Sequence, residues 1–192
     1  MNFLQFIEND EVISKVLDIA TKCQTKVFIV GGYVRDLILG KPSTDIDFVV
    51  DGDGINFAQN LIKELKPIPN ISVFKNFETA HFKHKGIMYE FVSARKESYS
   101  PQSRNPEVSR ATIEEDIRRR DFTINTLSIS LNEEDYGELH DVYDGLEHIQ
   151  NKIIKTPIEP GATFFDDPLR MMRAIRFASQ LNFSIADNCF KA

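Results

Sequence analysis

The sequence has few cysteines, no long apolar run and no excess of basic residues, and each absence excludes a class of protein. Its two cysteines, Cys23 and Cys189, lie far apart without metal-ligating neighbours, so we expect reduced, structural thiols. No apolar stretch approaches the roughly 20 residues that cross a bilayer. No basic segment precedes an apolar one at the start, so no secretory signal is visible. We therefore expect a cytoplasmic protein with no membrane partner.

The charge balance is acidic, with 29 Asp and Glu against 23 Lys and Arg and a net charge of -6. Because nucleic-acid surfaces need clustered Lys and Arg, this balance argues against a general one. If the chain handles RNA, the basic surface must be local or lie in sequence not present here. With 192 residues, 42% of them hydrophobic, the chain suits one compact domain or a domain plus part of a second.

Helical periodicity appears in several segments. Apolar residues recur every three or four positions over 12–20, which predicts an amphipathic helix. Asp53 can cap a second helix that Pro67 ends. A helical pattern resumes at Thr112, and a long helix is predicted to start near residues 167–168.

Runs rich in β-formers predict the strands. They lie at residues 26–30, 45–50, 71–74, 79–82, 87–94 and 139–143. Residues 84–86 are expected to turn a hairpin. Ser, Pro, Arg and Asn dominate residues 95–110, which predicts a mobile surface loop.

The most informative segment is the glycine turn at Gly31 and Gly32, followed by an Asp-x-Asp at Asp45 and Asp47. Alternation along a strand puts the two aspartates on one face, with the apolar residues between them on the other. Each element alone favours an ordinary turn or a solvated strand face. Together, near N–H groups that can receive phosphate oxygens, the carboxylates suit metal-assisted nucleotidyl transfer.

Glu90 lies in the middle of an otherwise apolar strand. A carboxylate that points inward without a partner is costly. A metal ion shared with Asp45 and Asp47 would remove that cost. The sequence alone leaves two alternatives open: Glu90 faces solvent, or it is a third carboxylate beside the other two.

Residues 118–125 read Arg-Arg-Arg-Asp-Phe-Thr-Ile-Asn. Consecutive helical arginines point in different directions, and pairing with the acidic residues 114–116 is the ordinary explanation. The following mixture of polar and apolar residues instead suits an Arg for a triphosphate and an Asp and Asn for sugar or phosphate oxygens. We favour the binding role for Arg120, Asp121 and Asn125 only.

Residues 165–178 combine a helix start with an arginine stripe. Pro168 suits the first helical position with Asp167 as N-cap. Arg170, Arg173 and Arg176 step by three residues and share one side of the helix. Asp167 and Arg170 could match the Watson–Crick edge of a base, or they could simply form an intrahelical ion pair. Both alternatives stay open.

These four motifs, in this order over roughly residues 25 to 185, resemble the class II tRNA nucleotidyltransferases. That family comprises the bacterial and eukaryotic CCA-adding enzymes and the bacterial poly(A) polymerases. The resemblance implies an α+β fold: a head domain of the polymerase-beta type over residues 1–155, with a mixed five-stranded sheet flanked by helices. Residues 156–192 would begin an all-helical neck. We expect the chain to be the catalytic head of a longer protein.

The resemblance also implies roles for individual residues. Asp45 and Asp47 would hold two Mg²⁺ ions, and Glu90 would complete the site. The glycine turn and Arg35 would touch the triphosphate, and Asp167 with Arg170 would read the incoming base. The residues expected to bind nucleotide are Gly31, Gly32, Arg35, Arg120, Asp121, Asn125, Asp167, Arg170, Arg173 and Arg176.

The implied reaction is template-independent addition of CCA, from CTP and ATP, to the 3′ end of tRNA, with tRNA bound mostly by other parts of the protein. Residues 75–81 lack the basic stretch of the poly(A) polymerases, which favours CCA addition. Asp166 replaces the family's usual Glu, and Glu78 to Ala80 replace its usual Gly-Thr. Alternatives are poly(A) addition, A-only or CC-only addition, an antibiotic-type nucleotidyltransferase, and a catalytically silent nucleotide-binding regulator. The sequence leaves the oligomeric state open.

Overall fold

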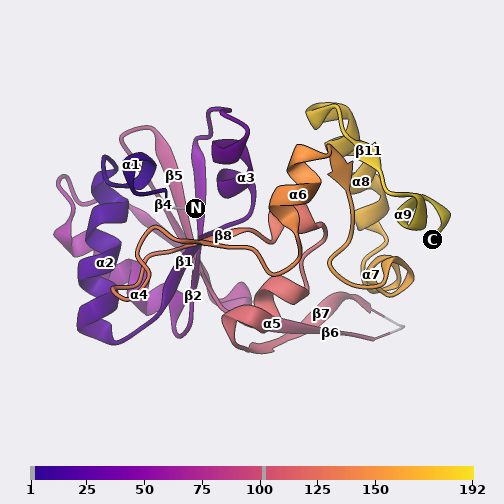
Figure 1. Cartoon of the computed structure of the whole chain (residues 1–192). Coiled ribbons are helices and arrows are strands. Elements are labelled where there is room, and N and C mark those ends of the chain that lie inside the picture. The colour runs from indigo at the N-terminus through magenta and orange to yellow at the C-terminus, as the bar shows by residue number, and fades with distance from the viewer. Residues whose placement is uncertain (1–2, 101–102) are drawn as a thin grey trace.

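The structure is a computed structural model that describes residues 3–100 and 103–192, without the side chains of residues 97–108. One seven-stranded sheet organises it, in the order β3-β4-β5-β2-β1-β8-β9 (Figure 1). Neighbouring strands are antiparallel, except that β2 and β5 are parallel. The strands are β1 (Val27–Val30), β2 (Asp45–Val50), β3 (Ile71–Phe74), β4 (Thr79–His84), β5 (Ile87–Ser93), β8 (Ser128–Ser130) and β9 (Leu139–His140).

Helices surround this sheet and continue beyond it. Helices α2 and α4 cover one face, and the C-terminal helices form a separate group at the other end of the molecule (Figure 1). The short strands β10 (Ile153–Ile154) and β11 (Ser184–Ile185) pair in parallel within that group. The helices are α1 (Leu4–Ile7), α2 (Glu11–Cys23), α3 (Gly32–Ile38), α4 (Gly54–Leu61), α5 (Ile113–Arg118), α6 (Gly145–Gln150), α7 (Pro160–Asp166), α8 (Leu169–Leu181) and α9 (Asp187–Lys191), with 3-10 turns η1 (Ile62–Glu64), η2 (Lys75–Phe77) and η3 (Thr123–Asn125).

Strand β2 lies between a large hydrophobic core on one face of the sheet and a small one on the other, and this position orients its aspartates. Ile46 and Phe48 enter the large core beneath α2 and α4, where the Phe48 ring stacks on Phe91 with centroids 4.3 Å apart. Val49 points the other way, into a small cluster beneath α5. Because side chains alternate along a strand, Asp47 shares the α5 face with Val49.

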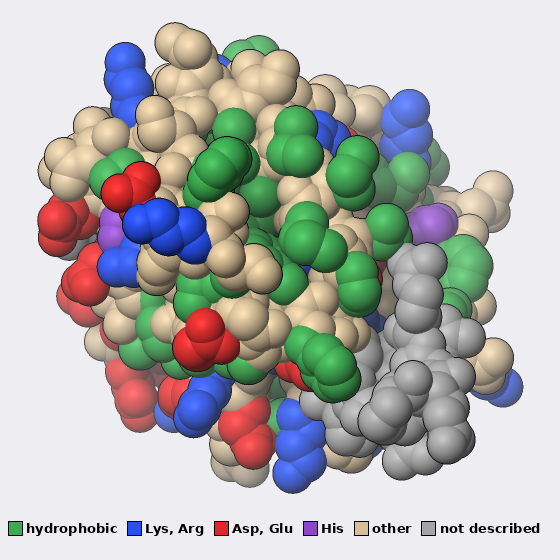
Figure 2. Space-filling view, turned by 90° about the vertical axis from the view of Figure 1, so that its right-hand side faces the viewer, with side chains coloured by type: hydrophobic (Ala, Val, Ile, Leu, Met, Phe, Trp, Pro, Cys, Tyr) green, Lys and Arg blue, Asp and Glu red, His purple; other side chains and the backbone are tan. Residues whose placement is uncertain are grey.

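Exposed apolar side chains gather on the face formed by the C-terminal helices (Figure 2). A concentration of this kind is typical of a contact surface rather than of scattered exposed residues. No helix among the described residues is long and apolar enough to cross a membrane. The exposed apolar residues of α7, α8 and α9 are Phe165, Leu169, Met171, Met172, Ile175 and Phe190.

The predicted α+β class is confirmed, and the sheet is larger than expected. It has seven strands rather than five, because β8 and β9 extend the edge beside β1. Strand β8 has only three residues and gives little periodic signal. The strand expected over 139–143 ends at His140, because both oxygens of Asp141 accept from the backbone N–H groups of Gly145 and Leu146, which starts α6.

The loop expected at residues 95–110 is wrong. Strands β6 (Arg95–Ser100) and β7 (Ser103–Arg110) form a two-stranded antiparallel ribbon, and residues 101–102 lie outside the described part. The segment shows no alternation of apolar and polar residues, which is the signal that reveals a half-buried strand. The ribbon therefore depends on backbone pairing between its two strands, which the composition does not predict.

Helix starts were predicted to within one or two residues. Asp53 caps α4 as expected, with its carboxylate accepting from the Asn56 N–H at 2.9 Å. Helix α8 begins at Leu169, one residue later than expected, with Pro168 as the N-cap residue. The Asp167 carboxylate still accepts from the Leu169 N–H at 3.0 Å. Asp167 therefore does contribute to capping α8.

Gly145 allows α6 to pack against η3, which contains Asn125. A Cβ at Gly145 would overlap the Thr123 carbonyl oxygen and lie 3.0 Å from the Leu127 side chain. We expect Gly145→Ala to lower the free energy of unfolding by about 2 kcal/mol or more, because backbone must move.

Gly40→Ala is the matched control. Gly40 has a positive φ, of 65°, but nothing lies within 4 Å of the position that a Cβ would take there. Its cost should be limited to the roughly 1 kcal/mol of left-handed strain. Urea denaturation of both variants measures the difference. Equal losses in the free energy of unfolding would show that the contacts around Gly145 can accommodate a methyl group.

Candidate functional site

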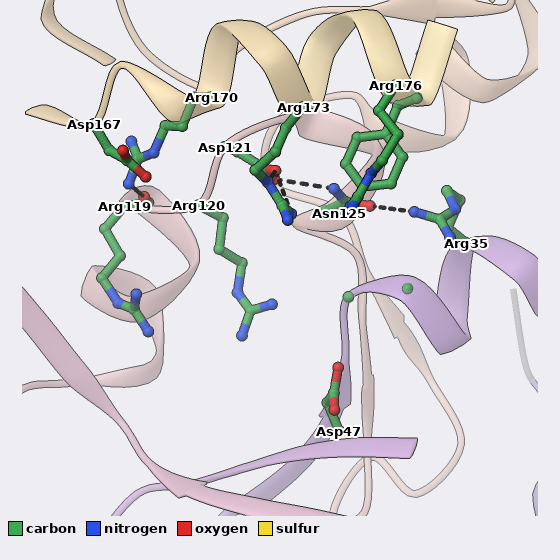
Figure 3. Close-up of a pocket in the computed structure, with 13 residues that line it drawn as sticks. Arg35, Asp47, Arg119, Arg120, Asp121, Asn125, Asp167, Arg170, Arg173 and Arg176 are labelled. Carbon is green, nitrogen blue, oxygen red and sulfur yellow. Dashed lines mark hydrogen bonds and ion pairs between the residues drawn. The ribbon is translucent and has the colours of Figure 1, made fainter. Parts of the chain in front are cut away.

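A cavity of about 470 Å³ opens between the glycine turn, the end of α5 and helix α8 (Figure 3). Its walls come from segments far apart in sequence, brought together where the sheet meets the C-terminal helices. The lining residues are Gly31, Gly32, Arg35, Asp47, Arg119, Arg120, Asp121, Asn125, Asp167, Arg170, Arg173, Arg176 and Phe177.

The cavity is strongly cationic in an acidic protein. Six arginines and three aspartates line it, although the whole chain has a net charge of -6. Positive charge of this local kind attracts a polyanion such as a triphosphate. All ten residues expected from the sequence to bind nucleotide are among the lining residues, which places them together without testing their roles.

A chain of polar contacts ties the α8 wall to the α3 wall. Asp121 accepts from Arg173 at 2.6–2.7 Å and from the Asn125 amide at 2.9 Å. The Asn125 oxygen in turn accepts from Arg35 at 2.8 Å (Figure 3). Arg35 also forms a two-donor pair with Asp36. The network fixes two guanidinium groups at the cavity wall.

Phe177 is the aromatic centre of this wall. The guanidinium carbons of Arg35, Arg173 and Arg176 lie 5.1, 5.2 and 4.9 Å from its ring centroid. The Phe122 ring meets it edge-on, with centroids 5.9 Å apart. Cations are attracted to the ring face, so Phe177 helps to hold three like charges close together.

Asp167 and Arg170 both line the cavity, as their spacing suggested. Arg170 is only 8% exposed and donates to the backbone carbonyls of Arg119 at 2.9 Å and Thr163 at 3.4 Å. These contacts anchor Arg170 to the polypeptide backbone. Asp167 is half-buried beside it (Figure 3).

The glycine turn approaches the opposite wall closely. Gly31 has φ 75°, and a Cβ there would lie 3.1 Å from Nη1 of Arg120 and 3.9 Å from an oxygen of Asp47. A side chain would therefore fill the space between these groups. The Gly31 N–H donates to the Leu127 carbonyl at 3.2 Å, so it is not available to phosphate as the sequence suggested.

The carboxylates of the Asp-x-Asp region crowd one another. Asp47 and Glu90 are partners in the parallel β2–β5 register, so Glu90 lies beside Asp47 instead of standing alone. Burial raises the pKa of Asp47 to about 6, with a further rise from the charges of Glu90 and Asp45 that Arg120 partly offsets. Asp45 is exposed, Glu90 is half-buried, and neither lines the cavity.

Within the described residues, no three His, Cys, Asp or Glu side chains are grouped as a ready-made metal site. The chemistry of the donors nevertheless fits a divalent cation. Oxygen ligands are those that Mg²⁺ prefers, and it commonly uses one or two carboxylates together with substrate phosphates and water. Burial and the neighbouring carboxylates raise the pKa of Asp47 and so disfavour its charged form, an effect that a bound cation would offset.

Two lining residues were missed as site candidates in the sequence. Arg119 and Phe177 lie within the motifs that carry the family resemblance, but neither was given a role in the site. Both contribute to the cavity wall. The three-residue step from Arg170 through Arg173 to Arg176 places Phe177 next to the stripe, and that position was the available signal.

Residues 27–155 match the family described as the Poly A polymerase head domain. This match covers more than half of the chain. The chain belongs to the poly(A) polymerase head-domain family. An A-adding tRNA nucleotidyltransferase of Aquifex aeolicus (strain VF5) is 44% identical to this chain over 161 residues, which are 84% of this chain and 19% of the relative.

Two solved structures support the same assignment. The chain superposes with a TM-score of 0.79 on a tRNA nucleotidyltransferase complexed with a primer tRNA and an incoming ATP analogue, at 41% identity, covering 92% of this chain and 48% of the other. It superposes with a TM-score of 0.86 on a CCA-adding enzyme, at 31% identity, covering 98% and 44%. The chain therefore spans less than half the length of each of these relatives.

The raised pKa of Asp47 predicts a pH-dependent stability. Its pKa is 3.8 in an unfolded chain and about 6 in the fold, so the folded state binds more protons between about pH 4 and pH 6. Ionising Asp47 therefore destabilises the fold as pH rises through this window, by on the order of 3 kcal/mol. Without divalent cations, Asp47→Asn should raise the melting temperature at pH 7.5 by roughly 4 °C or more.

The gain from Asp47→Asn should shrink toward zero at pH 4, where wild-type Asp47 is already protonated. Asp51→Asn, at an exposed aspartate just after β2, is the matched control and should shift the melting temperature little at either pH. Differential scanning calorimetry across pH gives the comparison. An Asp47→Asn variant no more stable than wild type at pH 7.5 would contradict the raised pKa of Asp47.

Proposed function

We propose that this chain is the catalytic head of an enzyme that transfers nucleotides from CTP and ATP to the 3′ end of tRNA, completing its CCA sequence. The observation that carries the proposal is the arginine-lined cavity of about 470 Å³ with Asp47 in its wall. The arginines can bind a polyanionic substrate there, next to a carboxylate that can bind a cation. The family match and the names of the relatives support the same reaction class.

The arginines would bind the triphosphate. Arg120 is held beside the glycine turn and Asp47, so it lies nearest the strand with the carboxylates. Arg35 and Arg173 approach from the other wall, each fixed by the network through Asp121 and Asn125. Donors that are already oriented lower the cost of charge developing on the phosphates during transfer.

Asp45 and Asp47 would hold Mg²⁺, with Glu90 adding negative charge beside them. When bound, the metal would supply Lewis-acid stabilisation of the phosphates and activation of the attacking hydroxyl. The protein contributes the arrangement that this chemistry needs. Strand β2 fixes the two aspartates on one face, and the register with β5 brings Glu90 alongside.

In the proposed reaction, the 3′-hydroxyl oxygen of the tRNA attacks the α-phosphorus in line with the leaving group. A new bond forms between that oxygen and phosphorus, the bond from the α-phosphorus to the bridging oxygen breaks, and pyrophosphate leaves. The hydroxyl proton is lost to water. Arg35 and Arg120 offset the negative charge that moves onto the pyrophosphate.

Asp167 would read the base, because its half-buried carboxylate can accept from an exocyclic amino group. Cytosine and adenine both carry such a group beside a ring acceptor, whereas uracil and guanine present a carbonyl there. Arg170 is anchored on two backbone carbonyls and would present its remaining edge to the base. This pairing favours CTP and ATP together over the other nucleotides.

Addition of A alone is the second candidate, and the Aquifex relative named as A-adding favours it. The two candidates differ in their tRNA substrate and in their use of CTP. Incubating the full-length protein with tRNA that lacks CCA, and with tRNA ending in CC, separates them. We expect C incorporation from CTP on the first and A from ATP on the second.

The same assay tests the carboxylates. Asp45→Ala and Asp47→Ala should each lower turnover by at least about a thousandfold, because catalysis depends on the bound metal. Asp18→Ala, on α2, is the control away from the site and should keep wild-type turnover. Incorporation of A but never of C would select the A-adding alternative. Near-wild-type turnover in either aspartate variant would overturn the metal assignment.

Base reading makes a separate prediction. In the full-length protein, Asp167→Ala should reduce discrimination against UTP and GTP by roughly 1–3 kcal/mol, because the acceptor for the amino group is lost. Asp166→Ala is the matched control, since Asp166 is the adjacent carboxylate and does not line the cavity. Single-nucleotide incorporation gives kcat/KM for each base. Unchanged rejection of UTP and GTP would reduce Asp167 to a helix cap.

A further inference from the structure

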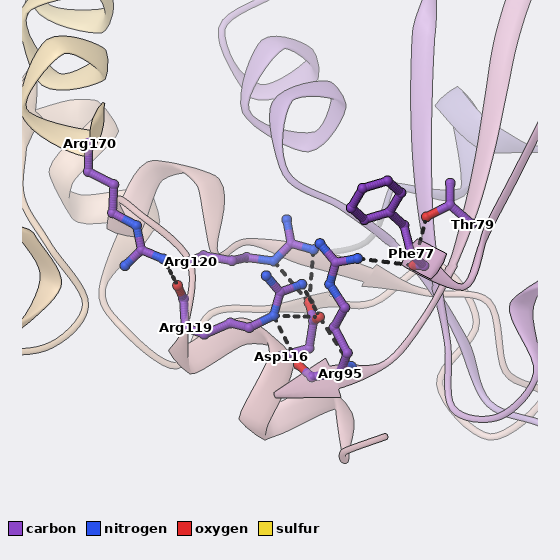
Figure 4. Close-up of polar contacts among 7 residues, drawn as sticks. All are labelled: Phe77, Thr79, Arg95, Asp116, Arg119, Arg120 and Arg170. Carbon is purple, nitrogen blue, oxygen red and sulfur yellow. Dashed lines mark hydrogen bonds and ion pairs between the residues drawn. The ribbon is translucent and has the colours of Figure 1, made fainter. Parts of the chain in front are cut away.

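Asp116 is a buried carboxylate that contacts three arginine residues (Figure 4). It lies on α5 with no exposed surface. Its Oδ1 accepts from Arg119 Nη2 at 2.6 Å and its Oδ2 from Arg120 Nη2 at 3.0 Å. The Arg95 backbone N–H points at the same carboxylate, 3.4 Å from Oδ1. Each oxygen thus holds one of the arginines that line the cavity.

These contacts decide which edges of the guanidinium groups face the cavity. Asp116 receives both Nε and Nη2 of Arg120, at 3.3 and 3.0 Å. This leaves Nη1 directed toward Gly31, 3.1 Å from the position of a Cβ there. A guanidinium that is held by one edge presents its other edge in a fixed direction, whereas the guanidinium of an unrestrained side chain has no fixed direction.

The charge balance also suits an anionic ligand. Burial acts to raise the pKa of Asp116, but the charges of Arg120 and Arg119 outweigh it, so the net pKa is lowered and the carboxylate stays ionised. One negative charge then faces two positive ones. The two arginines together keep a surplus positive charge, and the Asp116 carboxylate that orients them is buried away from solvent.

The same group of residues connects distant parts of the wall. Arg119 Nε donates to the Arg95 carbonyl at 2.9 Å, and Arg95 Nη1 donates to the Phe77 carbonyl at 3.1 Å. On the other side, Arg170 donates to the Arg119 carbonyl at 2.9 Å (Figure 4). Asp116 is therefore linked, through Arg95 and Arg119, to η2, the start of β6 and helix α8.

We propose that Asp116 is a positioning residue that aims Arg120, and with it Arg119, at the phosphates of the incoming nucleotide. The inference rests on the proposed function and adds the group that orients its phosphate-binding arginines. Asp116 itself touches no substrate, because it is fully buried beneath the arginines. Its effect on nucleotide binding passes through the guanidinium groups that it holds.

A double-mutant cycle tests this. In the full-length protein, Asp116→Asn should weaken binding of ATP with Mg²⁺ about tenfold in the wild-type background. In an Arg120→Ala background the same change should weaken it less than threefold, because the main group that Asp116 orients is gone. Calorimetric titration measures the affinities. Glu114→Gln, an exposed carboxylate on the same helix, is the matched control and should bind as wild type.

A residue that supported only the fold would behave differently. Its loss would weaken ATP binding equally in both backgrounds, and that result, or unchanged binding by Asp116→Asn, would overturn the proposal. If the wild-type protein bound no ATP, the proposed function would fail as well. If the wild-type protein bound ATP and Asp116→Asn bound it equally well, this inference would be wrong and the proposed function would stand.

The wild-type protein gives an independent measurement if Asp116→Asn does not fold. The Nε–H of Arg120 should show a protected NMR signal in the free protein, because it donates to Asp116. Positioning requires that this bond persists when ATP binds, so the signal should remain protected. Loss of protection on adding ATP would mean that phosphate displaces Asp116, which would overturn the proposal.

Discussion

The site depends on holding like charges together. Guanidinium groups around one cavity repel each other, and a small acidic domain must offset that repulsion without neutralising the cavity. Two carboxylates bound to the arginines do so: Asp116 pairs with Arg119 and Arg120, and Asp121 pairs with Arg173. Phe177 adds an aromatic face that three guanidinium groups share. Removing one partner of such buried pairs costs more than the pair itself contributes.

Much of the sheet and several helix starts could be predicted, because apolar periodicity and capping are local signals. The separation of the β2 aspartates from Phe48 followed from alternation alone. The alignment of Glu90 with Asp47 did not, because register between strands depends on the partner strand. The β6–β7 ribbon escaped prediction for the opposite reason, since no buried face marks it in the sequence.

The candidate site divides in the same way. The nucleotide-binding candidates chosen from residue types, spacing and family resemblance all line one cavity, whereas Asp45 and Glu90 do not. Their partners could not be read from sequence. Asp121 meets Arg173 across 52 residues, and Arg35 meets Asn125 across 90. No local sequence signal reveals that Asp121 forms an ion pair with an arginine, or that Arg170 is hydrogen-bonded to backbone carbonyls.

The cavity is shared by two stretches of chain, and this has a consequence for the modularity of the protein. The family match ends at residue 155, yet Asp167, Phe177 and three of the six lining arginines come after it. A chain trimmed to the matched residues would keep the Asp-x-Asp strand and lose half of the cationic wall. Exchange of the C-terminal helices between relatives would thus change the wall of the cavity itself. The family match and the lining of the cavity therefore end at different places in the chain.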